Sequence, residues 1–456
     1  MRTSPILRLL VMGILLVALN VPLTMMCGVV GERAARRNEV VQDVSRDWGG
    51  EQTIAGPVLS IPYRYSWMDS NGREQIGTEL YHFLPESLEI DGAIEPGERR
   101  RTLFTVIVYT ARLKVRGRFA APRMTNVQPA PVAVLWDQAK VSVGIEDPRG
   151  IARGIALNWN GQTEPFVPGS GRVALFGTGV QANAPGITAT RTDPLRFELD
   201  LDIKGTRRFR VVPSGNETVV NLTSTWPHPS FLGATPDPSR VDDTGFAGSW
   251  RMPYFGRGFP PEWKGGDTQL DNTISSQASA SAFGVSLIQP VDIYAQTDRA
   301  VKYAVLFIVM TFVIAFLWEI TGGVLVHPIQ YLFVGFTMCV FYLLLLSLAE
   351  HRGFDAAYSI AASATIALLA WYWSWVLGGR KQGFLMGAAL TGLYGYLYLL
   401  LRLEDYALLA GSIGLFLMLA LVMFLTRRID WYELRLGAKL GTAAGREEHA
   451  DPSGTV

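Results

Sequence analysis

Long apolar runs constrain this chain more than any other feature of its sequence. After Lys302, five such runs follow one another with only short polar links between them. An α-helix rises about 1.5 Å per residue, so roughly 20 apolar residues cross the ~30 Å hydrocarbon core of a bilayer. Short links between spans predict antiparallel neighbours in one compact bundle. The five runs are Tyr303–Ile320, Pro328–Leu348, Ala356–Leu377, Phe384–Leu401 and Tyr406–Leu425.

A sixth apolar run, Ile6–Val30, lies near the N-terminus and is also long enough to span. The alternative to a membrane anchor is a cleaved signal peptide, which has a shorter apolar core and a small-x-small cleavage site. The exit from this run reads Thr24-Met-Met-Cys27-Gly28 and contains no such site. We therefore expect an uncleaved signal anchor and about six spans in total.

Lysine and arginine near the span ends indicate the orientation, because cytoplasmic loops are enriched in both. A cytoplasmic N-terminus places most of these residues on the cytoplasmic side, whereas the cluster Arg33, Arg36 and Arg37 disagrees. We expect both termini to be cytoplasmic and residues 32–300 to face outward, into the periplasm of a bacterium. The cytoplasmic set would be Arg2, Arg8, Arg380, Lys381, Arg427, Arg428, Arg435 and Lys439.

The large middle segment shows the period-two alternation of half-buried β-strands. Apolar and charged residues alternate through 113–119 and 197–203, and Gly-Pro punctuation separates many such short runs. This pattern predicts an all-β, sandwich-like domain. Residues 231–281 lose the alternation, so we expect long loops there, with a flexible stretch at 275–282. The predicted domains are 1–31 (anchor), 32–300 (periplasmic β domain), 301–428 (five-helix bundle) and 429–456 (cytoplasmic tail, partly disordered).

Composition and motifs argue against several function classes. The net charge of +1 offers no field for nucleic acid, so we expect no nucleic-acid partner. Cys27 and Cys339 both lie in apolar runs, which leaves the middle segment without a disulfide or cysteine-based zinc site. The sequence contains no phosphate loop, zinc-protease helix or nucleophile elbow, and its five histidines are scattered. We expect no catalytic residue, no cofactor and no metal.

The stretch Trp226-Pro-His-Pro-Ser-Phe231 is the most unusual part of the middle segment. Its two prolines predict a rigid, extended turn that presents Trp226 and His228 together. The stretch is a candidate recognition loop, and the alternative is a corner that caps the sandwich.

Ionisable and polar residues gather near the ends of the predicted spans. Charges at membrane depth point to function, whereas charges at span ends can reach water or cap helices. We favour the structural interpretation but retain these residues as candidates, because several would share the periplasmic face and could form a docking ring. In such a ring, Glu350 or Asp405 could pair with Arg299 or Arg402. The candidates are Glu319, His327, Gln330, Glu350, His351, Glu404 and Asp405.

Small residues recur every four positions along 383–395, at Gly383, Gly387, Thr391 and Gly395. Such a stripe allows neighbouring membrane helices to approach closely. We expect it to serve packing and not to line a substrate path.

Several of these segments resemble the CreD family of bacterial inner-membrane proteins. In the middle segment the resemblance includes Trp48-Gly49, Asp147-Pro-Arg-Gly-Ile151 and Trp226–Phe231. Near the membrane it includes Pro290–Tyr294, Arg299-Ala-Val-Lys302-Tyr303, His327-Pro-Ile-Gln330-Tyr331, Phe341–Leu348 with Glu350-His351, Glu404-Asp405-Tyr-Ala-Leu-Leu409 and Thr426–Tyr432. Ala349, Thr206 and Arg352 depart from the pattern that we expect of this family.

The resemblance implies a role in cell-envelope integrity, with outer-membrane stability, colicin tolerance, β-lactam response and a two-component regulatory system, and it attaches no catalytic residue. The leading hypothesis is a non-enzymatic inner-membrane protein that acts in the envelope and its stress response. Its partners would be the lipid bilayer and an envelope protein, or a lipid or polymer ligand, in the periplasm. Two alternatives remain open: a transporter or lipid-handling protein with a periplasmic receiver domain, and a membrane-bound envelope hydrolase.

Overall fold

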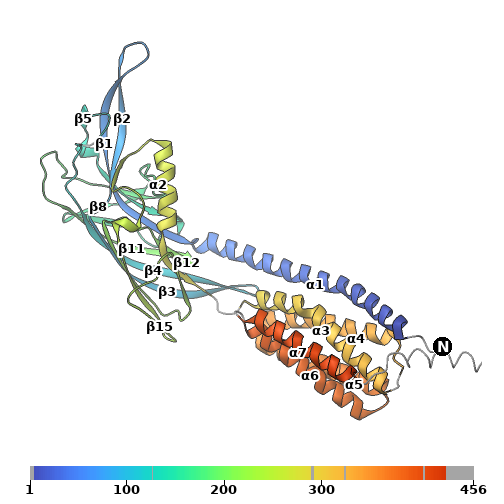
Figure 1. Ribbon diagram of the computed structural model, residues 1–456. Coiled ribbons are helices and arrows are strands. Elements are labelled where there is room, and N and C mark those ends of the chain that lie inside the picture. The colour runs from blue at the N-terminus through green and yellow to red at the C-terminus, as the bar shows by residue number, and fades with distance from the viewer. Residues whose placement is uncertain (1–4, 126, 289–291, 323–324, 404–405, 428–456) are drawn as a thin grey trace, which may run out of the picture. The chain divides into compact units, whose positions relative to one another are not determined.

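The computed structural model describes residues 5–125, 127–288, 292–322, 325–403 and 406–427 (Figure 1). The chain divides into two compact units, Met1–Arg36 with Val291–Val456 and Arg37–Pro290. We call the first the helical unit and the second the β domain. The predicted tail at 429–456 lies outside the described residues.

Membrane helices make up the helical unit, as the apolar runs predicted. Within the described residues, five helices are long and apolar enough to cross a membrane, and α7 contains a shorter apolar stretch, Leu409–Phe424. The first helix also continues well beyond its apolar part. The helices are α1 (Pro5–Trp48), α3 (Ile293–Gly322), α4 (Pro328–Arg352), α5 (Phe354–Val376), α6 (Arg380–Arg402) and α7 (Ala407–Thr426).

Two glycines of the predicted small-residue stripe let α6 approach α5. A β-carbon added at Gly383 would lie 2.7 Å from the carbonyl oxygen of Ala370, and one at Gly387 would lie 3.0 Å from Ala370 Cβ. A β-carbon at Gly395 would meet nothing within 4 Å. Gly383 and Gly387 therefore serve helix packing, whereas Gly395 faces open space.

Two sheets form the β domain in the described part of the chain. The ten-stranded sheet contains β1 (Gln52–Met68), β2 (Glu74–Phe83), β5 (Ala133–Val134), β6 (Lys140–Ile145), β9 (Val167–Pro168), β10 (Gly179–Asn183), β12 (Arg208–Val211), β14 (Pro229–Leu232), β17 (Glu262–Lys264) and β18 (Phe283–Leu287). The eight-stranded sheet contains β3 (Ser87–Arg101), β4 (Phe104–Phe119), β7 (Ala156–Trp159), β8 (Gln162–Pro165), β11 (Leu195–Thr206), β13 (Glu217–Ser224), β15 (Ser239–Asp242) and β16 (Gly245–Pro253).

The apolar faces of both sheets share one hydrophobic core, which makes the domain a sandwich. β11 pairs antiparallel with β4, so that Leu199 lies opposite Val115 and Leu201 opposite Leu113. These four side chains are buried, and the charged residues between them point away from the core. The alternation in the sequence therefore predicted parts of two central strands, β4 and β11, and their buried faces.

The prediction of long loops at 231–281 was wrong. This segment contains β15, β16, β17 and a helix, α2 (Thr268–Ser281), and the stretch expected to be flexible ends that helix. Asp267 caps α2 by accepting hydrogen bonds from the backbone N–H groups of Gln269 and Leu270. Only Ile274 and Ala278 of α2 are buried, so its apolar face is too narrow to be recognised in the sequence.

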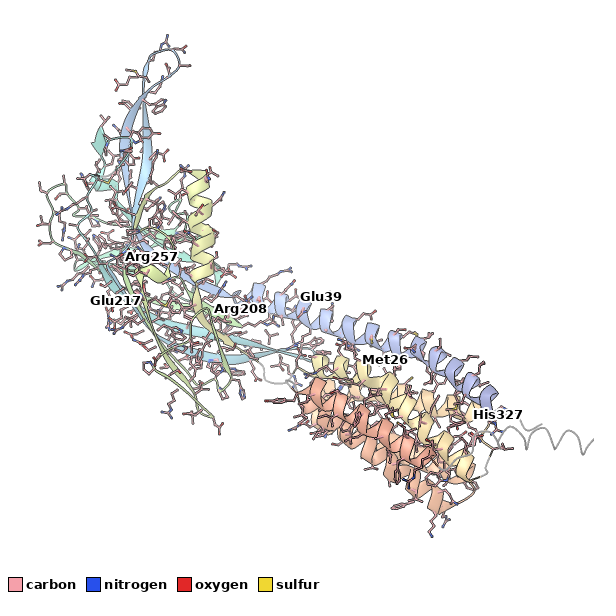
Figure 2. The ribbon with its side chains drawn as sticks, viewed as in Figure 1. Met26, Glu39, Arg208, Glu217, Arg257 and His327 are labelled. Carbon is pink, nitrogen blue, oxygen red and sulfur yellow. The ribbon has the colours of Figure 1, made fainter. Side chains whose placement is uncertain are left out.

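Arg257 organises a turn of the β domain from a fully buried position (Figure 2). Its Nε donates to Phe259 O at 3.0 Å, and its Nη1 donates to Ser214 O at 3.1 Å and Gly215 O at 3.0 Å. Burial lowers the pKa of Arg257 to about 10. The side chain acts as a hub for carbonyl groups that would otherwise lack donors.

His82 lies wholly buried on β2, on the face of the sheet that α2 covers. Its Nδ1 shares a hydrogen bond of 2.8 Å with Ser60 Oγ, and its ring lies 5.1 Å from that of Trp263. Burial lowers the pKa of His82 from 6.5 to about 4, because the charged imidazolium cannot be hydrated there. The histidine is therefore neutral at pH 7.

Acid should loosen this part of the sandwich. The folded-state pKa of His82 lies below its ordinary value, so its contribution to stability is complete above about pH 6.5 and is lost as the pH falls towards 4. Linkage gives a loss of about 2 kcal/mol between pH 7 and pH 5. Hydrogen exchange of peptides covering 52–83 in the intact protein measures this loss. In the His82→Asn variant these peptides should exchange faster than in wild type at pH 7, but their loss of protection between pH 7 and pH 5 should be smaller. An equal loss in the two proteins would contradict the role given to His82.

Candidate functional site

A buried carboxylate near the C-terminal end of α3 carries the first polar cluster of the helical unit. Glu319 is 4% exposed, and its Oε1 forms an ion pair of 2.6 Å with Arg8 Nη1 of α1. Tyr331 of α4 donates its hydroxyl to Glu319 Oε2 at 3.0 Å. We call Glu319, Arg8 and Tyr331 the first triad, and it joins three helices.

A second triad repeats these residue types near the opposite ends of α3 and α4, with its arginine further along α1. Glu350 of α4 accepts a hydrogen bond of 3.0 Å from the hydroxyl of Tyr294 in α3. Arg33 of α1 lies 3.8 Å from Glu350 Oε1. The carboxylate is again buried, with 6% of its side chain exposed.

The two triads are reciprocal. In the first, α3 supplies the carboxylate and α4 the tyrosine; in the second, these roles are exchanged. Arg8 and Arg33 are separated by the same number of residues along α1 as Tyr294 and Glu319 along α3. This separation corresponds to about 38 Å of helix, slightly more than the ~30 Å hydrocarbon thickness. This spacing is the one expected of charges near the two edges of a bilayer, and the triads set the register of α1 against α3.

A third cluster of the same residue types joins α5 to α6. Asp355 Oδ2 pairs with Arg402 Nη2 at 2.6 Å, and Asp355 Oδ1 accepts from the hydroxyl of Tyr398 at 2.9 Å. The Asp355 and Arg402 side chains are 60% and 58% exposed. This third triad has the geometry of the first without its burial.

Two predicted candidates at the start of α4 serve as a helix cap. His327 Nδ1 accepts from the N–H of Ile329 at 3.3 Å, and Gln330 Oε1 accepts from the N–H of His327 at 2.8 Å. This is a capping box with histidine in the first position and proline directly after it. The structural interpretation favoured from the sequence accounts for both residues.

The other candidates near the membrane are not brought into one ring by any contact described here. His351 lies one helical turn from Ser347, with its Nδ1 3.0 Å from Ser347 O, and Lys302 pairs with Asp298 on its own helix at 2.6 Å. Arg299 is a half-buried residue of α3. Glu404 and Asp405 lie outside the described residues.

The Trp226–Phe231 stretch lies against the core of the β domain. Trp226 Nε1 donates to Ile288 O at 3.0 Å, and Phe231 contacts the rings of Phe246 and Trp250 edge-on. His228 is exposed beside them. The stretch continues into edge strand β14, which is the arrangement expected of a corner that caps the sandwich.

Sequence reasoning missed the partners that complete the triads. Arg8 entered only as an orientation charge, Arg33 as part of a contradictory cluster, and Tyr294 and Tyr331 only as members of motifs. The equal spacing along α1 and α3 is the one signal that could have paired them. It becomes visible only once the helices are known to be neighbours.

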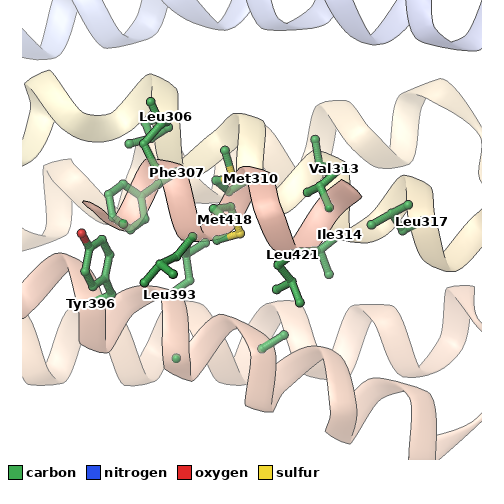
Figure 3. A pocket seen from close by; sticks show the side chains of 16 residues that line it. Leu306, Phe307, Met310, Val313, Ile314, Leu317, Leu393, Tyr396, Met418 and Leu421 are labelled. Atoms are coloured by element: carbon green, nitrogen blue, oxygen red, sulfur yellow. The ribbon is translucent and has the colours of Figure 1, made fainter. Parts of the chain in front are cut away.

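An apolar cavity of about 400 Å³ lies between α3, α6 and α7 (Figure 3). Leucine, valine, isoleucine, methionine and phenylalanine side chains supply nearly all of its lining. The hydroxyl of Tyr396 donates to Ala410 O at 2.5 Å, so it is already satisfied. The cavity can hold hydrocarbon but offers little to a polar substrate. Among the described residues, no group of three or more His, Cys, Asp or Glu could hold a metal ion.

Apolar spanning helices joined by buried charge clusters, together with a large β sandwich, define a polytopic membrane protein with an extensive domain outside the bilayer. Residues 4–432 match the family model described as inner membrane protein CreD. The chain is also 34% identical over 423 residues to inner membrane protein CreD of Escherichia coli (strain K12), covering 92% of each chain. The chain belongs to the CreD family of inner membrane proteins, as its motifs indicated.

Among solved structures, an M1 zinc metallopeptidase from Deinococcus radiodurans aligns with 72% of this chain and 92% of its own. The identity is 11% and the TM-score is 0.18. A similarity at this level carries no argument about fold or function.

Breaking the first triad should destabilise the helical unit far more than breaking the third. Arg8→Leu leaves the Glu319 carboxylate buried without a counter-charge, which costs about 3–5 kcal/mol. Arg402→Gln removes an exposed partner of Asp355 and should cost less than about 1 kcal/mol. The double variant Arg8→Leu/Glu319→Leu should recover most of the loss. Unfolding free energies in bicelles measure all three; equal losses for the two single variants would contradict the role of burial.

Proposed function

We propose that this protein is a non-catalytic inner-membrane protein that supports the integrity of the cell envelope. Both termini would be cytoplasmic, and residues 32–300 would form a periplasmic domain that contacts an envelope protein or a lipid or polymer ligand. The distribution of lysine and arginine supports this orientation. The motifs shared with the CreD family support the envelope role.

The observation that carries this proposal is the way in which α1 is held. Two buried carboxylates of the helical unit, Glu319 and Glu350, are each occupied by an arginine of α1 and a tyrosine. Charges near membrane depth usually indicate function, and here their function is to fasten a helix. This use of charge favours a scaffold over a chain of proton- or ion-carrying groups.

The same helix is fastened within the β domain. Ser45 Oγ lies 2.9 Å from Thr206 Oγ1, and Trp48 Nε1 donates to Tyr109 O at 3.2 Å. Arg99 and Lys204 lie over the Trp48 ring at 4.3 Å and 4.6 Å. The C-terminal part of α1 is therefore held by side chains of the β domain, just as its N-terminal part is held by side chains of the helical unit.

A serine and a histidine, residue types that hydrolases use for catalysis, lie side by side in the β domain, but both are buried away from any substrate. Ser60 and His82 share a hydrogen bond, but both are buried and the imidazole bonds no carboxylate in the described structure. A nucleophile must meet its substrate, so this pair does not support the hydrolase alternative.

The proposal is tested by measuring outer-membrane leakiness in a deletion strain of the source bacterium, using uptake of a bulky fluorescent probe. Wild type and Arg402→Gln should restore the barrier, because neither disturbs a buried triad. Arg8→Leu, at matched membrane levels, should restore it only partly. A deletion strain with an intact barrier would overturn the envelope role. Full restoration of the barrier by Arg8→Leu would show that the envelope role does not depend on the contact between Arg8 and Glu319.

The apolar cavity between α3, α6 and α7 supports a second candidate function, the handling of lipid. Gly392 lines this cavity, and a β-carbon added there meets nothing within 4 Å. Gly392→Leu should therefore fold normally while filling the cavity. Gly395→Leu is the matched control, because it also meets open space on α6 but does not line the cavity.

Native mass spectrometry of the protein released from nanodiscs measures the lipid that it retains. Under the lipid-handling hypothesis, Gly392→Leu should lose bound lipid several-fold relative to Gly395→Leu. Equal retention by the two variants would remove this candidate.

A further inference from the structure

One face of α1 within its apolar part consists of exposed small and polar residues. At 100° per residue these residues lie within about 60° of one another around the helix. All are exposed, and β-carbons added at Gly13 and Gly31 would meet nothing within 4 Å. We call this face the α1 seam; its members are Gly13, Asn20, Thr24, Cys27 and Gly31.

The seam is distinct from the face that α1 turns towards the bundle. The buried residues of α1 within the helical unit lie about 100° around the helix from the seam. Their spacing of three, four and seven residues is that of a helix-packing stripe. They are Met12, Leu19, Leu23, Met26 and Val30.

Asn20 is the residue that requires an explanation. It lies midway along α1 between Arg8 and Arg33, about 18–20 Å from each, and therefore at the centre of the bilayer. Its Nδ2 donates to Leu16 O at 3.2 Å, within its own helix. In the described structure, Oδ1 and the second N–H have no partner. A polar amide left unpaired in hydrocarbon is costly, so such groups in membrane helices bond to another helix.

We propose that the α1 seam is the contact surface for α1 of a second copy of this chain. Two copies inserted in the same direction place Asn20 at the same depth. An asparagine carries both donors and an acceptor, so two of them related by a two-fold axis satisfy each other. The hydroxyl of Thr24, which bonds Val21 O at 2.8 Å, keeps a free lone pair one turn away. Gly13 and Gly31 allow the backbones to approach on either side.

The sequence supplies its own reporter of this contact. Cys27 lies on the seam and is exposed, whereas Cys339 is buried in α4. In a Cys339→Ala background, copper-phenanthroline in native membranes should remove two electrons and two protons from paired Cys27 thiols and leave a disulfide-linked dimer. Such a bond forms only where the Cα atoms come within about 7 Å. Moving the thiol around the helix with Met25→Cys/Cys27→Ser should abolish the dimer.

The energetic test removes the polar side chain. Asn20→Leu should weaken dimerisation in lipid bilayers by about 3- to 30-fold, measured by single-molecule photobleaching as a function of dilution. Thr337→Val is the control, since its hydroxyl also bonds only its own helix, at Phe333 O. It should leave dimerisation unchanged.

Several outcomes would overturn the proposal. These are a monomeric wild type at every dilution, an Asn20→Leu variant that dimerises as well as wild type, and equal cross-linking at positions 25 and 27. Cross-linking of Cys27 to a different protein would assign the seam to a heterologous partner and would also reject the second copy.

Discussion

The helical unit depends on one constraint: the Glu319 carboxylate is held away from water at the edge of the bilayer. A charge in that position is tolerated only with a counter-charge and with its remaining oxygen satisfied. Arg8 supplies the first and Tyr331 the second. Because Arg8 belongs to α1, the requirement fixes the depth and rotation of the first helix against α3 and α4. The second triad holds the same helix at Arg33, so α1 cannot slide without breaking both.

This arrangement explains a feature that conflicted with the charge-based orientation. Arg33 belongs to a basic cluster on the side where the orientation rule expects few positive residues. Its proximity to Glu350 gives it a structural reason to be there. A residue needed as a counter-charge is retained at a position that topology alone would disfavour.

The sequence allowed the spans and the period-two strands to be predicted, because both follow from the local periodicity of apolar residues. The helix cap at His327 and Gln330 also follows from local spacing. The triads could not be predicted in this way, because Arg8 and Glu319 meet only through the rotation of two helices that are distant in the chain. Helix α2 was missed for a different reason. Its buried face consists of Ile274 and Ala278 alone. Asp267 caps the helix, but in the sequence an aspartate at this position cannot be told from one in an ordinary turn.

Helix α1 is held by polar contacts more than by packing. Of the apolar part of α1, 22% is buried, compared with 50% in α3 and α4. In water such a helix would dissociate, but in a bilayer lipid tails are as apolar as the bundle and shallow packing carries little penalty. Position then depends on the few groups that lipid cannot satisfy: Arg8, Arg33 and, at the midpoint, Asn20. The first two have their partners in the described structure. Since the third is subject to the same physics, its partner must come from another helix, and the face on which it lies determines where that helix has to be.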